Sequence, residues 1–139
     1  MTLSGSVIRA ALGIIAIAIS ITALNVQPIT STMYGLQITV KSNFPVDITI
    51  KSVEAWAYVN SQLVAYGITT QPITIKPYQS ASIIGTVEFY TPLSELQKMP
   101  NETPIKIVAS INYKIFMFIS QEIKPEVTMT LGELLSQFS

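Results

Sequence analysis

Residues 1–40 carry a single charged side chain, Arg9. The uncharged run Ala10–Val40 is 31 residues long and opens with the apolar stretch Ala10–Leu24. Widened to Leu3–Val26, the stretch has 24 residues, or ~36 Å of helix at ~1.5 Å per residue. That length crosses a hydrocarbon core of ~30 Å with some tilt. We therefore predict a single N-terminal transmembrane helix, with Arg9 reaching back to the lipid headgroups.

Two interpretations of this segment stay open, an uncleaved signal anchor and a cleavable signal peptide with Arg9 in its basic n-region. Cleavage needs small residues at −3 and −1. Ile21-Thr22-Ala23 is the nearest candidate but a mediocre one, and Ala16-Ile17-Ala18 fits better but lies inside the apolar run. We favour the anchor, which assigns residues 1–28 to the membrane and 29–34 to a linker. Because positive charge stays inside, both interpretations put the N-terminus in the cytoplasm and the C-terminal domain outside.

Small residues at spacings of 3, 4 and 3 share one face of the expected helix. We predict a helix-packing seam there, because small residues let two helix backbones approach closely in lipid. The seam consists of Gly13, Ala16, Ser20 and Ala23. A second small stripe, through Ala11 and Ala18, leaves open the alternative that alanine is simply common in apolar segments.

Beyond Thr32 the hydrophobic period changes to two, which is typical of half-buried strands. Roughly eight short strands follow, separated by turn residues, and residues 35–139 form one domain. We expect an all-β fold, a fibronectin/immunoglobulin-like antiparallel β-sandwich with one short helix. The expected strands lie near 36–40, 48–51, 53–59, 63–66, 73–75, 80–90, 105–113, 115–123 and 127–131.

Two short helices are predicted within or after the strands. The first follows Thr91, a good N-cap, with Pro92 at the first helical position. The second is amphipathic and C-terminal, with Thr130 and Glu133 forming a capping box. The apolar residues of this helix are Leu131, Leu134, Leu135 and Phe138. We favour docking of these residues on the chain's own sandwich. Docking on the membrane and docking on another subunit are the alternatives.

The segment Lys41–Gly67 resembles the type-2 late-embryogenesis-abundant family, also called the water-stress-and-hypersensitive-response domain. Members carry an Asn-Pro-Asn-like turn, here Ser42-Asn43-Phe44-Pro45, and a hairpin like "NGQLVASG", here with Ser61 at the usual glycine. The resemblance implies a fibronectin-like sandwich without catalytic residues, active in stress protection or in binding within membrane-tethered proteins. The resemblance extends over Gly35–Leu131. Within this range the segments Ile75–Ser80 and Leu93–Lys98 also match the family pattern.

Composition excludes several classes of function. The chain has no Cys and no His, so disulfides, thiolate zinc sites, Ser-His-Asp triads and Cys-His dyads are absent. Its net charge is zero, which argues against nucleic acid as a partner. No SxxK, DxD or P-loop motif occurs, so we expect no enzyme, no cofactor and no metal site. Isoleucine fills 21 of 139 positions, which suggests a thermophilic, archaeal-like source.

Candidate contact residues are apolar or lie in loops. The stretch Ile115–Ile119 is apolar on both faces, so Phe116, Met117 and Phe118 are either covered or available to a partner. Leu134, Leu135 and Phe138 are candidates for the same reason. Asn101-Glu102-Thr103 is a glycosylation sequon, although Pro104 directly after it lowers its quality. Nine aromatic residues belong either to the core, which we favour, or to a binding surface. They are Trp56, Tyr58, Tyr66, Tyr78, Phe89, Tyr90, Tyr113, Phe116 and Phe118.

The leading hypothesis is therefore a non-enzymatic, membrane-anchored, extracytoplasmic β-sandwich. It would act as an accessory or structural subunit of a membrane protein complex, with lipid and other membrane subunits, or itself, as partners. A secreted subunit of an extracellular filament is the alternative, since β-domains can exchange strands between protomers. A free stress-protective or ligand-binding module is a third class.

Overall fold

The computed structural model describes residues 19–115 and 119–136. This part of the chain is made of strands with two one-turn helices, as the sequence predicts. The elements are β1 (Ile19–Pro28), β2 (Met33–Ser42), β3 (Ile48–Val59), β4 (Gln62–Thr69), β5 (Ile73–Ile75), β6 (Ser80–Phe89), α3 (Leu93–Leu96), β7 (Pro104–Ile115), β8 (Ile119–Ile123), β9 (Glu126–Thr130) and α4 (Leu131–Leu135).

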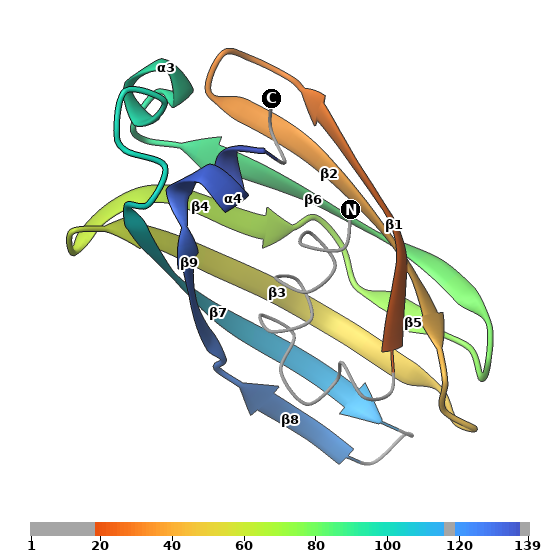
Figure 1. Cartoon of the computed structure of the whole chain (residues 1–139). Helices are drawn as coiled ribbons and strands as arrows, with labels where there is room; N and C mark the ends of the chain where they lie inside the picture. The colour runs from red at the N-terminus through yellow and green to blue at the C-terminus, as the bar shows by residue number, and fades with distance from the viewer. Residues whose placement is uncertain (1–18, 116–118, 137–139) are drawn as a thin grey trace.

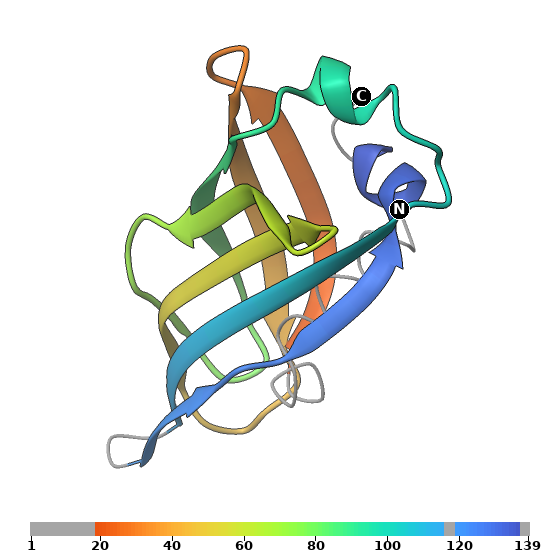
Figure 2. The ribbon, with the colours of Figure 1, turned by 90° about the vertical axis from the view of Figure 1, so that its left-hand side faces the viewer.

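All strand pairs are antiparallel, and the sheet runs in the order β1-β2-β6-β4-β3-β7-β8. The short β5 pairs with β3, and β9 continues beside β7. The sheet curls so that β1, β2 and β6 form one layer and β3 and β7 the other, with α3 and α4 at one end (Figures 1 and 2). The prediction of an antiparallel β-sandwich is thus confirmed.

Alternation along β2 decides which face is buried. Val40 is fully buried and pairs with Ala81, while Ile38 pairs with the buried Ile83 of β6. The residues that alternate with these two, such as Gln37, point to the outer face. A shift of one residue would turn the whole apolar set toward water, so this pattern fixes the register.

The core fills both ends of the space between the layers. One cluster lies where β1 begins and unites β2, β3, β5, β6 and β7 through Val40, Ile48, Ile50, Ile75, Ile83, Ile111 and Tyr113. The other lies beneath the two helices. It contains Ala57, Val59, Val64, Ala65, Phe89, Leu96, Ile105, Ile107, Met129, Leu131 and Leu135.

The structure corrects the predicted N-terminal helix where the two overlap. Residues from Ile19 onward form β1, an edge strand paired with β2 as far as Pro28, rather than the end of a membrane helix. Leu24 pairs with Ile38 and Val26 with Leu36, so both apolar side chains share the inward face. The prediction that the helix continues to Val26 is therefore wrong. Residues 1–18 lie outside the described part of the chain.

Both edges of the sheet are irregular. In β1 the register shifts between Ile21 and Ala23, and Thr22 donates a side-chain hydrogen bond to the carbonyl oxygen of Thr39 (3.2 Å). On the opposite edge, β8 and β9 are separated by Lys124 and Pro125. The Pro125 carbonyl accepts a bond from Ala109 (2.9 Å) and keeps the broken edge beside β7.

The β3–β4 connection is a hairpin, as the sequence predicts, and its loop has two residues, Asn60 and Ser61. Asn60 has φ 51° and Ser61 has φ 66°. Two positive φ angles define the turn whose twist matches that of paired strands. Asparagine tolerates this conformation, whereas the Cβ of serine crowds the following carbonyl.

We predict that Ser61→Gly raises the free energy of unfolding by roughly 0.5–1 kcal/mol, because relief of left-handed strain exceeds the entropic cost of glycine. Urea unfolding followed by the fluorescence of Trp56, the chain's one tryptophan, measures the change. Asn60→Gly is the matched control and should give a smaller gain. Destabilisation by Ser61→Gly would contradict this account of the turn.

Candidate functional site

The predicted helix-packing seam does not form one helical face. Gly13 and Ala16 lie outside the described residues, whereas Ser20 and Ala23 are on β1. Both pair with outward positions of β2, and the Ser20 hydroxyl accepts a hydrogen bond from the Asn43 side chain (2.7 Å). The described half of the seam therefore belongs to the outer face of the sandwich.

The C-terminal helix packs on its own domain. Thr130 caps α4, its hydroxyl accepting a bond from the Glu133 amide (3.2 Å), as the capping box predicts. Leu131 is fully buried and Leu135 nearly so, both in the core cluster beneath the helices. Leu135 is thus a core residue rather than a partner contact. Leu134 is half-buried, and Phe138 lies outside the described residues.

We predict that Leu131→Ala lowers the free energy of unfolding by about 2–5 kcal/mol, because the cavity sits among β9, α3 and α4. Leu134→Ala, in the same helix but half-buried, should cost clearly less. Urea unfolding of the full chain measures both variants. Equal costs would mean that α4 is not anchored through Leu131.

The glycosylation sequon lies in an exposed loop ahead of β7. The Asn101 carbonyl accepts a bond from the Gly132 amide (3.0 Å), and the Thr103 hydroxyl donates to the carbonyl of Pro100 (2.7 Å). A Cβ at Gly132 would lie 3.0 Å from that of Asn101, so the loop packs closely against α4. Occupancy of Asn101 stays a prediction. Phe116, Met117 and Phe118 lie outside the described residues.

The aromatic residues divide between the core and the outer face. Phe89 and Tyr113 are buried, and Phe89 packs edge-on against Tyr34 with ring centroids 5.7 Å apart. This part of the preferred core interpretation is confirmed. Trp56 and Tyr66 instead stand half-buried on the outer face of β3 and β4.

Trp56, Tyr66 and Glu54 form a small polar–aromatic cluster. Strand pairing places Trp56 opposite Tyr66, and their rings lie 5.7 Å apart at an angle of 46°. The Tyr66 hydroxyl donates to the Glu54 carboxylate over 2.6 Å. That bond, reinforced by partial burial and by the negative charge of Glu54, raises the pKa of Tyr66 to about 12. The bond fixes the ring and presents a rigid aromatic surface.

Because the pKa of Tyr66 is raised, the fold favours its neutral phenol. This stabilisation is fully present below pH ~10 and is lost as pH rises through about 12. We predict that Tyr66→Phe lowers the free energy of unfolding by about 0.5–1.5 kcal/mol at neutral pH and removes the matching decline above pH ~10. Unfolding curves across this range test it. The control variant Tyr58→Phe, changed on the same face, should retain the decline in stability above pH ~10. If Tyr58→Phe removed this decline, the assignment of the decline to Tyr66 would be contradicted.

The outer face continues from this cluster across β4, β6, β2 and β1. Ile68 and Ile84 are 39% and 38% exposed beside it. A shallow groove of about 310 Å³ follows, lined by residues of β1, β2 and β6 around Gly35. The aromatic cluster, the two isoleucines and the groove form one candidate contact surface, which we call the outer face.

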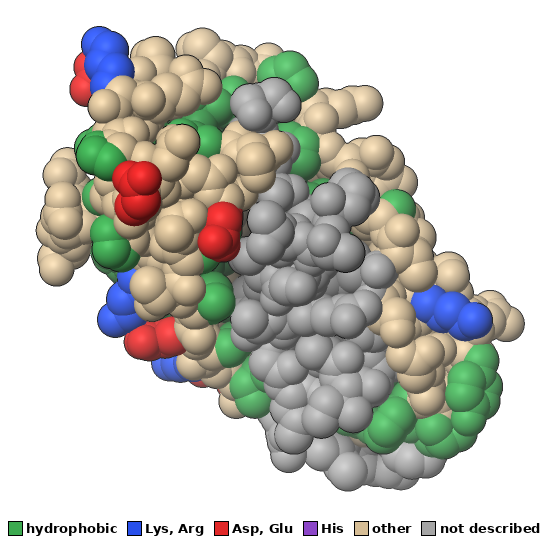
Figure 3. Space-filling view, in the orientation of Figure 1, with side chains coloured by type: hydrophobic (Ala, Val, Ile, Leu, Met, Phe, Trp, Pro, Cys, Tyr) green, Lys and Arg blue, Asp and Glu red, His purple; other side chains and the backbone are tan. Residues whose placement is uncertain are grey.

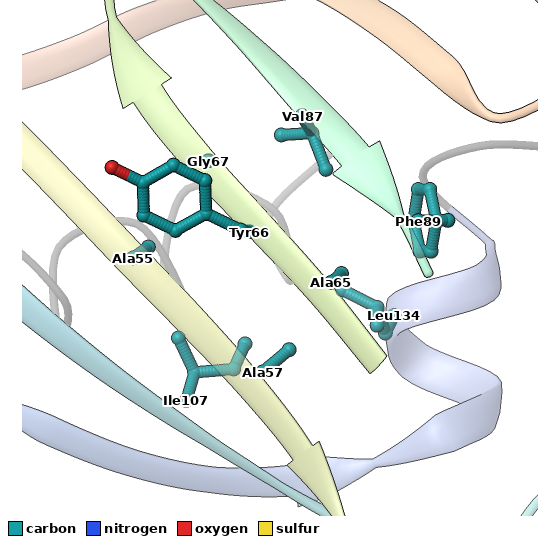
Figure 4. A pocket seen from close by; sticks show the side chains of 9 residues that line it. All are labelled: Ala55, Ala57, Ala65, Tyr66, Gly67, Val87, Phe89, Ile107 and Leu134. Atoms are coloured by element: carbon teal, nitrogen blue, oxygen red, sulfur yellow. The ribbon is translucent and has the colours of Figure 1, made fainter. Parts of the chain in front are cut away.

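The inner face holds an apolar cavity of about 100 Å³. Figure 4 shows Ala55, Ala57 and Ala65 on its floor, with Leu134 of α4 beside them. Ligand pockets usually measure about 300–1,000 Å³, so this space is a gap under α4 rather than a ligand site.

Within residues 19–115 and 119–136, no helix is long and apolar enough to cross a bilayer. The same residues contain no group of three or more acidic side chains placed to hold a metal ion.

Comparisons with known proteins bear on the fold. No family model matches the chain, and no curated protein matches it in sequence. The crystal structure of a protein from Archaeoglobus fulgidus is similar, with TM-score 0.52, 16% identity and coverage of 80% of this chain and 97% of that one. At that identity the similarity shows the shared fold alone.

Two further structures overlap less closely. A yeast GGA1 GAE domain has TM-score 0.45 and 14% identity, covering 81% of this chain and 90% of that one. A putative late embryogenesis abundant protein has TM-score 0.43 and 14% identity, covering 93% and 83%.

Proposed function

We propose that this protein is a non-enzymatic, extracytoplasmic β-sandwich, held at the membrane by the apolar residues before β1. There it acts as an accessory or structural subunit of a membrane protein complex. The observation that carries the proposal is the junction at Ile19, where the uncharged apolar segment meets the first strand with no polar linker. Membrane insertion of that segment would hold the sandwich directly against the bilayer.

The start of β1 shortens the proposed anchor. Leu3–Ala18 contains 16 residues, or ~24 Å of helix, whereas a bilayer core measures ~30 Å, and Arg9 within it has to reach back to the headgroups from the seventh position. A span this short would cross upright, without the tilt expected for a longer helix, and would thin the bilayer locally. Gly13 and Ala16 remain the proposed packing residues of this shorter segment.

The outer face supports an accessory role. It combines the rigid pair of Trp56 and Tyr66 with two partly exposed isoleucines and an adjoining groove. Aromatic side chains that are fixed in place bind a protein partner at low entropic cost. We propose this face, rather than α4, as the contact for another subunit.

A secreted subunit is the second candidate, because one observation favours it. Ala16-Ile17-Ala18 immediately precedes β1, so cleavage after Ala18 would release a domain whose first strand is intact. The objection that this site lies inside the apolar run loses force, since the residues beyond it belong to the sandwich.

We further propose that the chain is a distant member of the type-2 late-embryogenesis-abundant family. The sandwich fold supports this, as does the two-residue turn at Asn60 and Ser61 within the segment that carries the resemblance. Under this proposal the protein would serve in binding or protection rather than in catalysis.

Membrane attachment is tested on the native protein. We expect its intact mass to include residues 1–18, and the protein to stay with the membrane after alkaline carbonate washing. Leu12→Asp, which places a charge within the proposed span, should release the protein while leaving the sandwich folded. A native N-terminus at Ile19 would contradict the anchor and establish the secreted candidate.

A further inference from the structure

Charge is distributed unevenly along the sandwich. Four lysines and two acidic residues lie toward the end where β1 begins: Lys41, Lys51, Lys76, Lys114, Asp47 and Glu122. The rest of the described chain carries three lysines and six glutamates. We call the first region the basic end.

Strand pairing places these residues at one end of the sandwich, with Lys41 on the layer of β1, β2 and β6 and with Lys51 and Lys114 on the layer of β3 and β7 (Figure 1). Lys41 is opposite Ser80, Lys114 is opposite Thr49, and the neighbouring Ser42 is opposite Ile19. The Ser42 amide also donates to the carbonyl of Gln79 (2.9 Å), which joins the β2–β3 and β5–β6 connections. The basic end therefore surrounds the point where the chain enters the sandwich.

Three of the four lysines have no carboxylate partner among the described residues. Lys76 pairs with Asp47 at 3.1 Å, but Lys41, Lys51 and Lys114 form no ion pair there. Lys51 donates to the hydroxyl of Ser120 over 3.0 Å, a bond that orients its charge without neutralising it. The unneutralised charge fits an anionic partner.

Apolar and aromatic groups accompany these charges. Tyr78 is 60% exposed and has φ 57°, a left-handed conformation that strains a residue with a Cβ. Pro45 is exposed in the loop after β2, and Phe44 beside it is half-buried. Figure 3 shows hydrophobic side chains gathered around this loop. Tyrosine and lysine together are typical of surfaces at the headgroup level of a membrane.

We infer that the basic end is a lipid-binding surface that seats the sandwich on anionic headgroups. Lys41, Lys51 and Lys114 supply the charge, and Tyr78 enters the interface. The inference rests on the proposed function, because an anchor that precedes Ile19 would bring this end to the bilayer. It adds an orientation, in which the acidic remainder of the domain faces away from the membrane.

The experiment uses the full chain reconstituted into vesicles of phosphatidylcholine, with or without phosphatidylglycerol. Because the sequence lacks cysteine, Gln79→Cys and Ser94→Cys each place one fluorophore, at the basic end and on α3 respectively. A headgroup-attached quencher should quench the first label more strongly. The difference should grow with phosphatidylglycerol and shrink at high salt, which screens exposed charges.

Charge variants then identify the residues. Each lysine near an anionic surface contributes about fivefold to partitioning, so joint replacement of Lys41, Lys51 and Lys114 by Gln should reduce the phosphatidylglycerol effect by tenfold or more. The matched control replaces Lys98, Lys106 and Lys124 by Gln and should leave it unchanged. Tyr78→Gly should weaken quenching while the melting temperature holds or rises, because it also relieves the positive φ.

Failure of this inference is distinguishable from failure of the anchor. Equal quenching at the two labels in a carbonate-resistant protein would overturn the lipid-binding surface and leave the anchor standing. If the protein is released by carbonate, sedimentation with phosphatidylglycerol vesicles tests the surface alone. Binding that the triple lysine variant abolishes would support the inference, and absence of binding would overturn it.

Discussion

The pairing of β3 with β7 is the interaction on which the rest of the structure depends. It runs from Ile48 to Tyr58 and gives the layer its two long central strands. β3 also pairs with β4 and β5, and β7 with β8 and β9, so these two strands organise most of the sheet. Both core clusters include residues of both strands. Loss of this register would therefore separate the two halves of the core.

Much of this arrangement follows from local sequence. The alternation of Ala55 and Ala57 with Trp56 and Tyr58 predicts a strand, and the structure confirms it as part of β3. The Thr130 cap of α4 is equally local, because it depends on residues three apart. The uncharged stretch from Ile19 to Val26 is different. It suits a membrane helix as well as a strand, and only the partner β2 decides between them.

The outer face was harder to predict from the sequence. Trp56 and Tyr66 are ten residues apart, and their contact requires the hairpin and its register. The period of two puts Trp56 on the face opposite to Ala55 and Ala57, but both faces carry apolar side chains, so the sequence alone does not say which face is outward. The bond between Tyr66 and Glu54 could not be predicted either, because it is a diagonal contact across two strands. The basic end likewise joins lysines from three strands and one connection.

The irregular edges have a consequence for behaviour at high local concentration. Unpaired strand edges template the addition of further strands, and a lysine, a proline or a bulge discourages it. Here the register shift near Thr22 distorts one edge, while Lys124 and Pro125 interrupt the other. Copies crowded together would therefore resist growing into a continuous intermolecular sheet. Polymerisation through backbone pairing would first require β1 to leave its own domain, which makes self-association a matter of strand exchange rather than of simple edge contact.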